Sequence, residues 1–183
     1  FLFLSGHAHF ALDPSSLRAS GGAELQVALL SKALVQQGHQ VSLLSADTGQ
    51  GDRTVWEKIS IRTGGRFDTG RLFDTLFSIP RMMNILLEER PDVVVVYGWT
   101  SLLYLLAKLR CMTAYKLVFI CALDSEIDGG FFRENPLRGY FLKQGMRFSD
   151  TRYGITEHQA HLFQKEGMSC SVTRLLLQDN KKI

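Results

Sequence analysis

Four consecutive valines, Val93–Val96, constrain the fold of this chain more than any other feature of its sequence. An unbroken run of β-branched residues is typical of a strand buried on both faces, as in the interior of a parallel sheet. A strand with one face in water would instead alternate apolar and polar residues. The run therefore favours an α/β protein in which helices cover both faces of the sheet.

Other short β-rich runs alternate with helical patterns along the 183 residues. The predicted strands are Phe1–Ser5, Val41–Ser45, Ile59–Arg62, Val93–Tyr97, Leu117–Cys121, Tyr153–Thr156 and Val172–Leu177. Strand–helix alternation with short links implies right-handed crossovers. We expect a Rossmann-like, doubly wound α/β fold, with a mostly parallel sheet of about seven strands, helices on both faces and a single domain over residues 1–183.

Helix signals fall between these strands. Ala23–Gln37 carries apolar stripes and stops at Gly38, a natural residue for a helix end. Gly70–Glu89 is periodic but contains Pro80, which predicts a kink or two helices. The predicted caps are Thr100, Asn135 followed by Pro136, and Thr156 paired with Gln159 in a capping box.

Composition excludes several classes of protein. Apolar residues make up 45% and charged residues 21% of the chain, a balance that does not fit a disordered protein. No stretch approaches the roughly 18 apolar residues that a membrane span needs. The net charge of +3 is too small to indicate nucleic-acid binding, and the basic residues lack interleaved aromatic residues.

Cysteine usage points to a reducing compartment. The three cysteines, Cys111, Cys121 and Cys170, show no C-x-x-C spacing, which argues against a disulfide framework and a zinc ribbon. We therefore expect a cytoplasmic protein. The chain opens directly in a strand without an initiator Met, so we also expect it to be a segment of a longer protein.

A glycine pair, Gly21-Gly22, directly precedes the first long helix. Glycine lets a ligand approach the backbone closely, and the N–H groups of a helix start form a potential anion site. The pair lies roughly fifteen residues after the first strand, whereas a dinucleotide fingerprint follows its strand at once. A Walker A sequence is absent. A ligand loop and a plain helix-entry turn both remain open.

The segment around this glycine pair resembles group 1, family 4-like retaining glycosyltransferases with the GT-B fold. It reads Gly21-Gly22-Ala23-Glu24-Leu25-Gln26-Val27 and continues to Gly38-His39-Gln40-Val41, like the GGAE-type helix start and the GH-x-V entry to the second strand in that family. Three later segments follow in the family's order: Arg90–Val96, Phe148–Gln159 and Val172–Gln178. The resemblance covers nearly the whole chain.

The resemblance implies that the chain is one domain of a two-domain enzyme, and it implies the reaction of that enzyme. In that family two Rossmann-like domains face each other across a cleft, and this chain matches the N-terminal, acceptor-binding half, without the C-terminal donor domain. The full protein would move a sugar from a nucleotide-diphosphate sugar to an acceptor hydroxyl with retention, using no cofactor and no obligatory metal. The implied partners are that second domain and a sugar or lipid-linked acceptor.

Ligands of open α/β sheets bind beyond the carboxyl ends of the strands, which places the candidate site residues. Gly21 and Gly22 are candidates for a loop against the donor phosphates or the acceptor. The candidates for acceptor binding are His7, His9, Trp99, Thr100, Asp128, Thr156 and Gln159. A metal site is not expected, because the His-x-His pair lacks an evident third ligand.

Each of these candidates also has a structural interpretation. His7 and His9 alternate at a strand end, so at most one of them is expected to face the cleft, and a structural histidine is the alternative. Trp99 can stack on a sugar ring or simply cover the sheet. Thr156 also serves as the expected helix cap.

The segment Asp124–Asp128 is the most polar strand exit. Many relatives place a histidine at this point, and none occurs between Ala122 and Gly130. Asp124, with Glu126 beside it, is our candidate for the catalytic residue, and a solvated loop is the alternative. Glu126 and Glu134 have the spacing of the family's donor-site glutamate pair, but their place in the first domain argues against that role.

Two further hypotheses compete with sugar transfer by this domain. One is a stand-alone flavodoxin-like ligand-binding or protein-interaction module, with an apolar surface around Phe131, Phe132 and the C-terminal strand. The other adds a peripheral contact with the inner face of the membrane, and a solvated helix face is its alternative. The basic residues that suggest this contact are Arg138, Lys143 and Arg147, with Arg62, Arg66, Arg71 and Arg81 as a second cluster.

Overall fold

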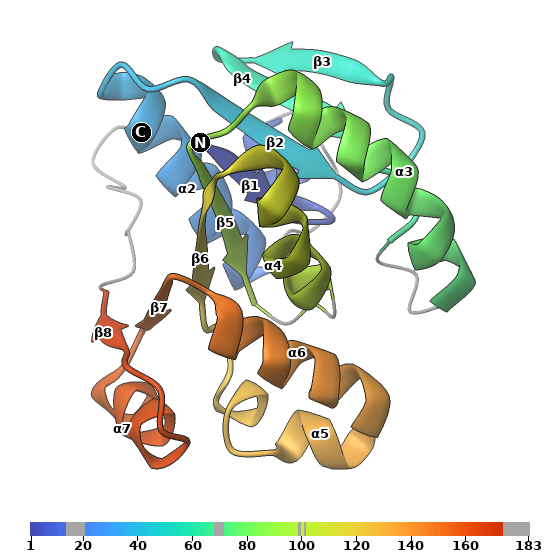
Figure 1. Cartoon of the computed structure of the whole chain (residues 1–183). Coiled ribbons are helices and arrows are strands. Elements are labelled where there is room, and N and C mark those ends of the chain that lie inside the picture. The colour runs from blue at the N-terminus through green and yellow to red at the C-terminus, as the bar shows by residue number, and fades with distance from the viewer. Residues whose placement is uncertain (14–20, 68–71, 99, 101, 174–183) are drawn as a thin grey trace.

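The computed structural model describes residues 1–13, 21–67, 72–98, 100 and 102–173. One eight-stranded sheet runs through the molecule in the order β3-β4-β2-β1-β5-β6-β7-β8 (Figure 1). All neighbouring strands are parallel except β3 and β4. The strands are β1 (Leu2–Leu4), β2 (Val41–Ser45), β3 (Arg53–Trp56), β4 (Ile59–Thr63), β5 (Val93–Tyr97), β6 (Lys116–Ile120), β7 (Thr151–Gly154) and β8 (Ser171–Val172).

Helices cover both faces of the sheet, so the expected Rossmann-like α/β fold is confirmed. The helical elements are α1 (Ala8–Leu12), α2 (Gly22–Gln36), α3 (Leu72–Glu89), α4 (Leu102–Thr113), the short 3₁₀ helix η1 (Asp124–Glu126), α5 (Gly130–Glu134), α6 (Pro136–Phe148) and α7 (Glu157–Lys165). None of the helices in the described part of the chain is long and apolar enough to cross a membrane.

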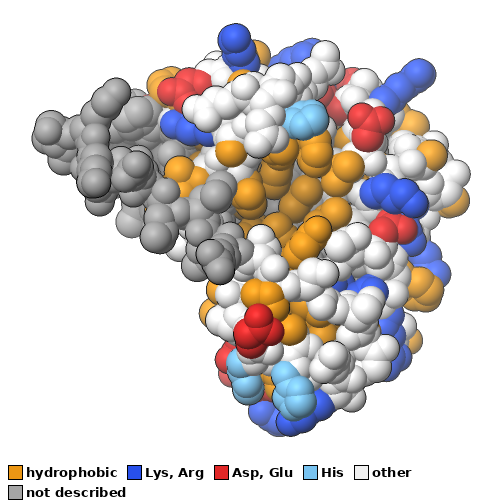
Figure 2. All heavy atoms as spheres, turned by 90° about the vertical axis from the view of Figure 1, so that its left-hand side faces the viewer, with side chains coloured by type: hydrophobic (Ala, Val, Ile, Leu, Met, Phe, Trp, Pro, Cys, Tyr) orange, Lys and Arg blue, Asp and Glu red, His pale blue; other side chains and the backbone are white. Residues whose placement is uncertain are grey.

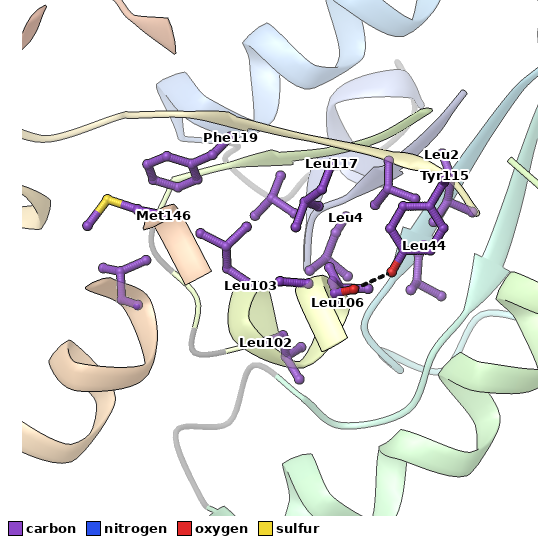
Figure 3. Close-up of a cluster of buried hydrophobic side chains, with 14 of the residues drawn as sticks. Leu2, Leu4, Leu44, Leu102, Leu103, Leu106, Tyr115, Leu117, Phe119 and Met146 are labelled. Atoms are coloured by element: carbon purple, nitrogen blue, oxygen red, sulfur yellow. Dashed lines mark hydrogen bonds between the residues drawn. The ribbon is translucent and has the colours of Figure 1, made fainter. Parts of the chain in front are cut away.

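The larger core lies between the sheet and helices α3, α4 and α6 (Figure 3). Leu4 of β1 and Phe119 of β6 point into it from the sheet, and Leu103 and Leu106 meet them from α4. Burying each such side chain contributes about 1.5–3 kcal/mol. The Tyr115 hydroxyl donates a 2.6 Å hydrogen bond to the Leu106 carbonyl oxygen, which satisfies the polar atom inside this core.

Close packing of α6 on α4 depends on Gly145. A Cβ atom at this position would lie 2.7 Å from the Leu103 side chain and 2.7 Å from the Tyr104 backbone nitrogen. Any larger residue would push the two helices apart, because backbone atoms cannot move as a side-chain tip can. The close contact fixes α6 against the sheet beside α4.

The opposite face carries a second core under α1 and α2. Phe3 and Leu43 point to this side from β1 and β2, and Val27 and Ala28 of α2 pack on them. Successive strand residues point to opposite faces, so Leu2 and Leu4 join the first core while Phe3 joins the second.

Helices α1 and α2 leave part of this face open. Val93, Val118 and Tyr153, from β5, β6 and β7, pack against the second core but are only partly buried. Figure 2 shows this side of the molecule, with a hollow lined by hydrophobic side chains. A mostly parallel sheet normally has both faces covered. In the described part of the chain, this stretch of the sheet has a complete helical layer on one face only.

Several details differ from the sequence-based expectations. The sheet has an extra antiparallel edge strand, β3, which forms a hairpin with β4. Of the two arrangements expected around Pro80, two helices are excluded, because the proline lies inside a single helix, α3. Pro136 is the first residue of α6 as predicted, but the Asn135 side chain makes no capping hydrogen bond. The last strand, expected over Val172–Leu177, is seen as Ser171–Val172, and residues 174–183 lie outside the described residues.

Candidate functional site

A cleft of about 650 Å³ lies at the carboxyl ends of β1, β5 and β6. Its walls come from the start of α2, the segment after β4, the first half of α3 and the first turn of α6. The lining residues are Leu4, Ser5, Gly6, His7, Gly22, Ala23, Glu24, Leu25, Gln26, Phe67, Thr75, Tyr97, Gly98, Thr100, Ala122, Leu123, Arg138 and Ile155. The ends of three neighbouring strands and the N-terminal parts of three helices therefore surround one cleft.

The start of α2 forms one wall of this cleft. Gly21 is the residue before the helix, and its carbonyl oxygen accepts the first helical hydrogen bond from the Leu25 amide at 3.0 Å. The N–H groups of the first helical turn have no acceptor within a helix. Gly22, Ala23 and Glu24 carry these groups and line the cleft, whereas Gly21 is exposed and outside the lining.

Gly22 is not required by the packing of the protein itself. A Cβ atom there would meet no other atom within 4 Å, and the residue lacks a positive φ. A side chain at this position would instead project into open space at the cleft wall. The glycine therefore leaves room for a ligand to approach the helix start, which favours the ligand-loop interpretation over a plain helix-entry turn.

Polar groups of both charges line the cleft. Arg138 contributes a guanidinium from α6, and Glu24 contributes a carboxylate from the first turn of α2. Burial, with smaller effects of Cys121 and Glu126, raises the pKa of the Tyr97 phenol to about 12. The Tyr97 hydroxyl thus keeps its proton at neutral pH and can donate a hydrogen bond to a ligand hydroxyl.

The two histidines after β1 have different environments. His7 directly precedes α1 and lines the cleft, with its ring stacked on Phe10 at a centroid distance of 5.9 Å. His9 lies inside α1 and is 8% exposed. Its Nδ1 atom is 2.6 Å from the Ser45 hydroxyl and its Nε2 atom 3.1 Å from the Thr48 hydroxyl. These contacts join α1 to the end of β2, and His9 does not reach the cleft lining.

The acidic residues after β6 do not line the cleft either. Glu126 is 6% exposed, and one of its carboxylate oxygens accepts a 3.0 Å hydrogen bond from the Ala122 amide. Asp128 accepts a 2.7 Å hydrogen bond from the Gly130 amide at the start of α5. Both carboxylates shape the loop whose residues Ala122 and Leu123 form the cleft wall.

Asp124 is tied to the start of α7. Its Oδ1 atom accepts a 3.1 Å hydrogen bond from the Gln159 side chain, and its Oδ2 atom lies 3.8 Å from His158 Nε2. Thr156 caps α7 by accepting from the Gln159 amide at 3.1 Å. The Gln159 side-chain oxygen Oε1 accepts a 2.7 Å hydrogen bond from the Ile155 amide, so the capping box closes one residue earlier than in the standard pattern.

Of the candidate site residues, His7, Gly22 and Thr100 line the cleft, and Thr100 also caps α4 through the Leu102 amide at 3.2 Å. The candidates outside its lining are His9, Gly21, Asp124, Glu126, Asp128, Thr156 and Gln159. Trp99 lies outside the described residues. The catalytic role of Asp124 or Glu126 stays a prediction, and the geometry gives both carboxylates local structural partners.

Other lining residues were not among the candidates. Glu24 and Gln26 follow the glycine pair directly, so that helix turn was the available signal. Phe67 follows the β4 strand, whose exit the strand-end rule also covers. Arg138 gave no sequence signal for the cleft, because its position depends on how α6 packs on α4. In the described part of the chain no cluster of three or more His, Cys, Asp or Glu residues could hold a metal ion.

A comparison with protein families gives a match that spans most of the molecule. The model of Glycosyltransferase Family 4 matches residues 20–169, from the glycine pair at α2 to the segment after α7. The chain belongs to glycosyltransferase family 4. The match confirms the resemblance found in the sequence. No curated protein matches the chain.

Solved structures similar to this family 4 domain share its fold. A UDP-N-acetylglucosamine 2-epimerase from Rickettsia bellii superimposes with a TM-score of 0.62 at 15% identity, over 95% of this chain. A candidate UDP-N-acetylglucosamine 2-epimerase from Listeria monocytogenes gives a TM-score of 0.57 at 14% identity, over 91% of this chain. The chain spans 44% and 42% of these two proteins, respectively. At this identity the likeness shows the fold, one half of a GT-B arrangement.

Proposed function

We propose that this chain is the N-terminal, acceptor-binding domain of a cytoplasmic glycosyltransferase. The complete enzyme moves a sugar from a nucleotide-diphosphate sugar to an acceptor hydroxyl and retains the anomeric configuration. It needs no cofactor and no obligatory metal. A C-terminal domain of the same protein holds the donor, and the acceptor is a sugar or a lipid-linked sugar.

The observation that carries this proposal is the position of the cleft at the point where the strand order reverses. From β1, the chain continues to β2 on one side and returns later to β5 on the other. In open α/β sheets this switch point is where ligands bind. The cleft lies there, between the end of β1 and the glycine start of α2. Membership of family 4 supplies the reaction class.

The cleft offers groups suited to positioning rather than to acid–base chemistry. In a retaining transfer the acceptor oxygen bonds to the anomeric carbon, the bond from that carbon to the phosphate oxygen breaks, and the leaving diphosphate takes the acceptor proton. Orientation and charge stabilisation then supply most of the rate. His7, Tyr97 and Thr100 can bind acceptor hydroxyls, and the start of α2 favours the negative charge of the diphosphate.

Two features support an acceptor-side role for this half. The chain spans less than half of the length of each of the two solved relatives. Its cleft lies at the carboxyl ends of the strands, at the edge of the sheet. Donor binding needs more charge neutralisation than Arg138 provides, and Arg138 is the one Lys or Arg among the described residues of the lining. We therefore place the donor pocket on the second domain.

The test uses the complete reading frame and a Gly22→Val variant. We expect this variant to lose at least about tenfold in nucleoside-diphosphate release from UDP- or GDP-sugars with an acceptor mixture, because the side chain fills the ligand space at the start of α2. Gly51→Val is the matched control, since a Cβ there also meets no atom closer than 3.9 Å and the residue lies away from the cleft.

The outcomes separate this proposal from its alternatives. Retention is checked by the anomeric coupling constant of the product in NMR spectra. Nucleotide-sugar consumption that proceeds equally without any acceptor would contradict glycosyl transfer. Ligand binding without turnover in the complete protein would instead favour a ligand-binding protein without catalysis.

A further inference from the structure

We propose that the outer side of α3 binds the same side of α3 in a second copy of the chain. The two helices pack antiparallel across a two-fold axis at Phe77, which gives a symmetric dimer. This surface, the α3 face, is made of Phe73, Asp74, Leu76, Phe77, Pro80 and Arg81. The proposal concerns assembly and is independent of the sugar-transfer reaction.

Apolar side chains lie on both sides of α3. Met82, Ile85 and Leu86 point inward and belong to the larger core. Phe73 is 73% and Phe77 83% exposed, and neither packs against the two cores of the described residues. A surface helix normally carries polar residues on its outer side, whereas a helix that is apolar all round is covered on all sides. We therefore expect the outer side of α3 to be covered in the assembled protein.

The exposed apolar residues of α3 have the spacing of a helix–helix contact. Phe73, Leu76 and Pro80 follow one another after three and then four residues, which places them in one stripe along the helix. Phe77 lies beside this stripe, one turn after Phe73. Figure 1 shows α3 at the right-hand edge of the molecule, beside the β3–β4 hairpin. A second helix can therefore approach the α3 face from outside.

The α3 face is large enough to take part in a stable interface. A phenylalanine side chain buries about 150–250 Å² when covered, so the rings of Phe73 and Phe77 expose roughly 300 Å² together. Two copies would bury roughly 600 Å² in these rings alone, which is half of the roughly 1,200 Å² that a small stable interface buries. The side chains around the two rings, with Leu76 48% exposed, add to this area.

The charges beside the apolar stripe make the α3 face complementary to itself. Asp74 and Arg81 are two helical turns apart, so they lie on the same edge of the stripe, with Phe77 between them. The same edges meet when two identical helices pack antiparallel about Phe77. Asp74 of one copy then lies opposite Arg81 of the partner subunit, and the symmetry repeats this pair at the other end of the contact.

Arg81 can take part in this contact without losing its partner in the chain. The guanidinium of Arg81 pairs with Asp52, and the side chains are 41% and 87% exposed, respectively. A guanidinium has five N–H donors in a planar fork, so it can bind a second carboxylate. The exposed pair with Asp52 therefore leaves Arg81 accessible to Asp74 of the partner subunit.

Another exposed apolar surface, on α6, does not complement itself in this way. Leu137 is 60% and Tyr140 52% exposed there. Neither α6 nor the neighbouring α4 contains an aspartate or glutamate, so a two-fold contact would bring like charges together. A two-fold interface uses the same patch on both subunits and needs both signs of charge on it. Of these two surfaces, the α3 face is the one that fits a second copy.

The dimer would also hold one wall of the cleft in place. Thr75 lies on the inner side of α3, lines the cleft and donates a 3.4 Å hydrogen bond to the Phe67 carbonyl oxygen. Its sequence neighbours, Asp74 and Leu76, belong to the α3 face. A second copy packed on the outer side would restrict the movement of this half of α3. Each copy keeps its own cleft, because the cleft and the α3 face lie on different sides of the helix.

The test measures the oligomeric state of the 183-residue chain by sedimentation equilibrium. We expect a dimer at about 100 μM protein, because interfaces of standard size reach at least micromolar affinity. Phe73→Ser with Phe77→Ser should weaken association at least about 100-fold, since the dimer loses four buried rings. Leu137→Ser with Tyr140→Ser is the matched control on α6, and it should associate like the parent chain.

Charge reversal tests the antiparallel arrangement itself. Asp74→Arg or Arg81→Asp alone places like charges opposite each other at both ends of the contact, and each should weaken association at least about tenfold. An equimolar mixture of these two variants should form dimers again, because each Arg then faces an Asp in the other variant. Circular dichroism melting checks that every variant is folded, since the altered side chains are exposed or half-buried.

Four results would overturn the proposal. The parent chain sediments as a monomer at this concentration. The α6 control loses as much association as the variant with both phenylalanines replaced. The two charge-reversal variants are folded, but their mixture contains no more dimer than either variant alone. The complete protein stays monomeric while the 183-residue chain dimerises, which would show that another part of the same protein covers the α3 face.

Discussion

At the scale of single residues, His9 is the clearest case of a candidate site residue that has a structural role. The ring is almost completely buried, and both of its nitrogens have hydroxyl partners, Ser45 and Thr48. Removing one partner of a buried hydrogen bond costs about 1–3 kcal/mol, because the other partner stays desolvated.

We therefore expect His9→Ala to lower the free energy of unfolding by about 1–3 kcal/mol, measured by urea denaturation. His7→Ala is the matched comparison. His7 lines the cleft, so its loss should weaken ligand binding and change stability by less. Equal destabilisation by the two substitutions would contradict the different roles assigned to the two histidines.

Sequence reasoning identified polar strand exits correctly but could not decide which side chains face the cleft. Asp124 and Glu126 follow β6 as expected, yet the turn of η1 directs Glu126 back to the Ala122 amide. If the turn began one residue earlier or later, a different side chain would face the cleft. Sequence patterns do not predict the conformation of a loop to within one residue. Gly22 was among the candidates because a glycine at a helix start lets a ligand approach the backbone closely.

At the scale of elements, Asp150 connects three of them. Its Oδ2 atom accepts hydrogen bonds from the Leu117 amide of β6 at 2.7 Å and from the Arg110 guanidinium of α4 at 2.5 Å, just before β7 begins. Burial would raise the pKa of Asp150, but these hydrogen bonds outweigh burial and lower it. The ionised carboxylate is thus the form that joins α4, β6 and β7.

This lowered pKa predicts the direction of a pH effect. A carboxylate with a lowered folded-state pKa stabilises the protein above its unfolded value of about 3.9, and that stability is lost as the pH falls through the folded pKa. We expect Asp150→Asn to destabilise the chain by about 1.5–3 kcal/mol at pH 7. The difference from the parent should shrink towards pH 2 in thermal melts.

Asp92→Asn is the control for this experiment, since the Asp92 side chain is exposed and has no hydrogen bond among the described residues. It should leave the pH profile unchanged. A constant difference between Asp150→Asn and the parent from pH 7 to pH 2 would show that the carboxylate charge is not what stabilises this junction.

Element prediction succeeded where burial dominates the sequence pattern and failed where it does not. The valines of β5 and the apolar run of β6 are in the expected places. β3 was missed because its residues are mostly exposed and its turn, Glu57-Lys58, has positive φ angles of 46° and 69°. Such tight hairpin turns normally carry Asn or Gly, so this hairpin leaves no recognisable turn signal.

At the scale of the whole molecule, parallel topology explains which residues share the cleft. The site was expected beyond the carboxyl ends of the strands, and Gly22 shares one cleft with Tyr97 and Ala122, at the ends of β5 and β6. Parallel topology makes this predictable, because all carboxyl ends lie at the same edge. The partly open sheet face over β5 to β7 was not predictable, since it depends on which side each crossover helix takes.

The same geometry limits what this half can bind alone. The lining groups suited to an anion are the start of α2 and the Arg138 guanidinium, and the Glu24 carboxylate in the same lining opposes a second negative charge. An anion at a helix start gains about 0.3–1 kcal/mol when exposed, far below the roughly 8 kcal/mol of a micromolar complex. We expect titration of the 183-residue chain with UDP and with GDP, followed by NMR, to show no saturation below about 1 mM.

Glu24→Gln is the informative variant in this titration, because it removes the opposing charge without changing shape. It should strengthen the weak nucleotide binding, and Glu57→Gln, on the distant β3–β4 turn, should not. A micromolar dissociation constant for the parent chain would place the donor pocket on this domain, and the acceptor-side assignment would then be wrong. Weak binding that Glu24→Gln strengthens would support the acceptor-side assignment. The diphosphate would then reach the start of α2 only while the C-terminal domain holds the rest of the donor.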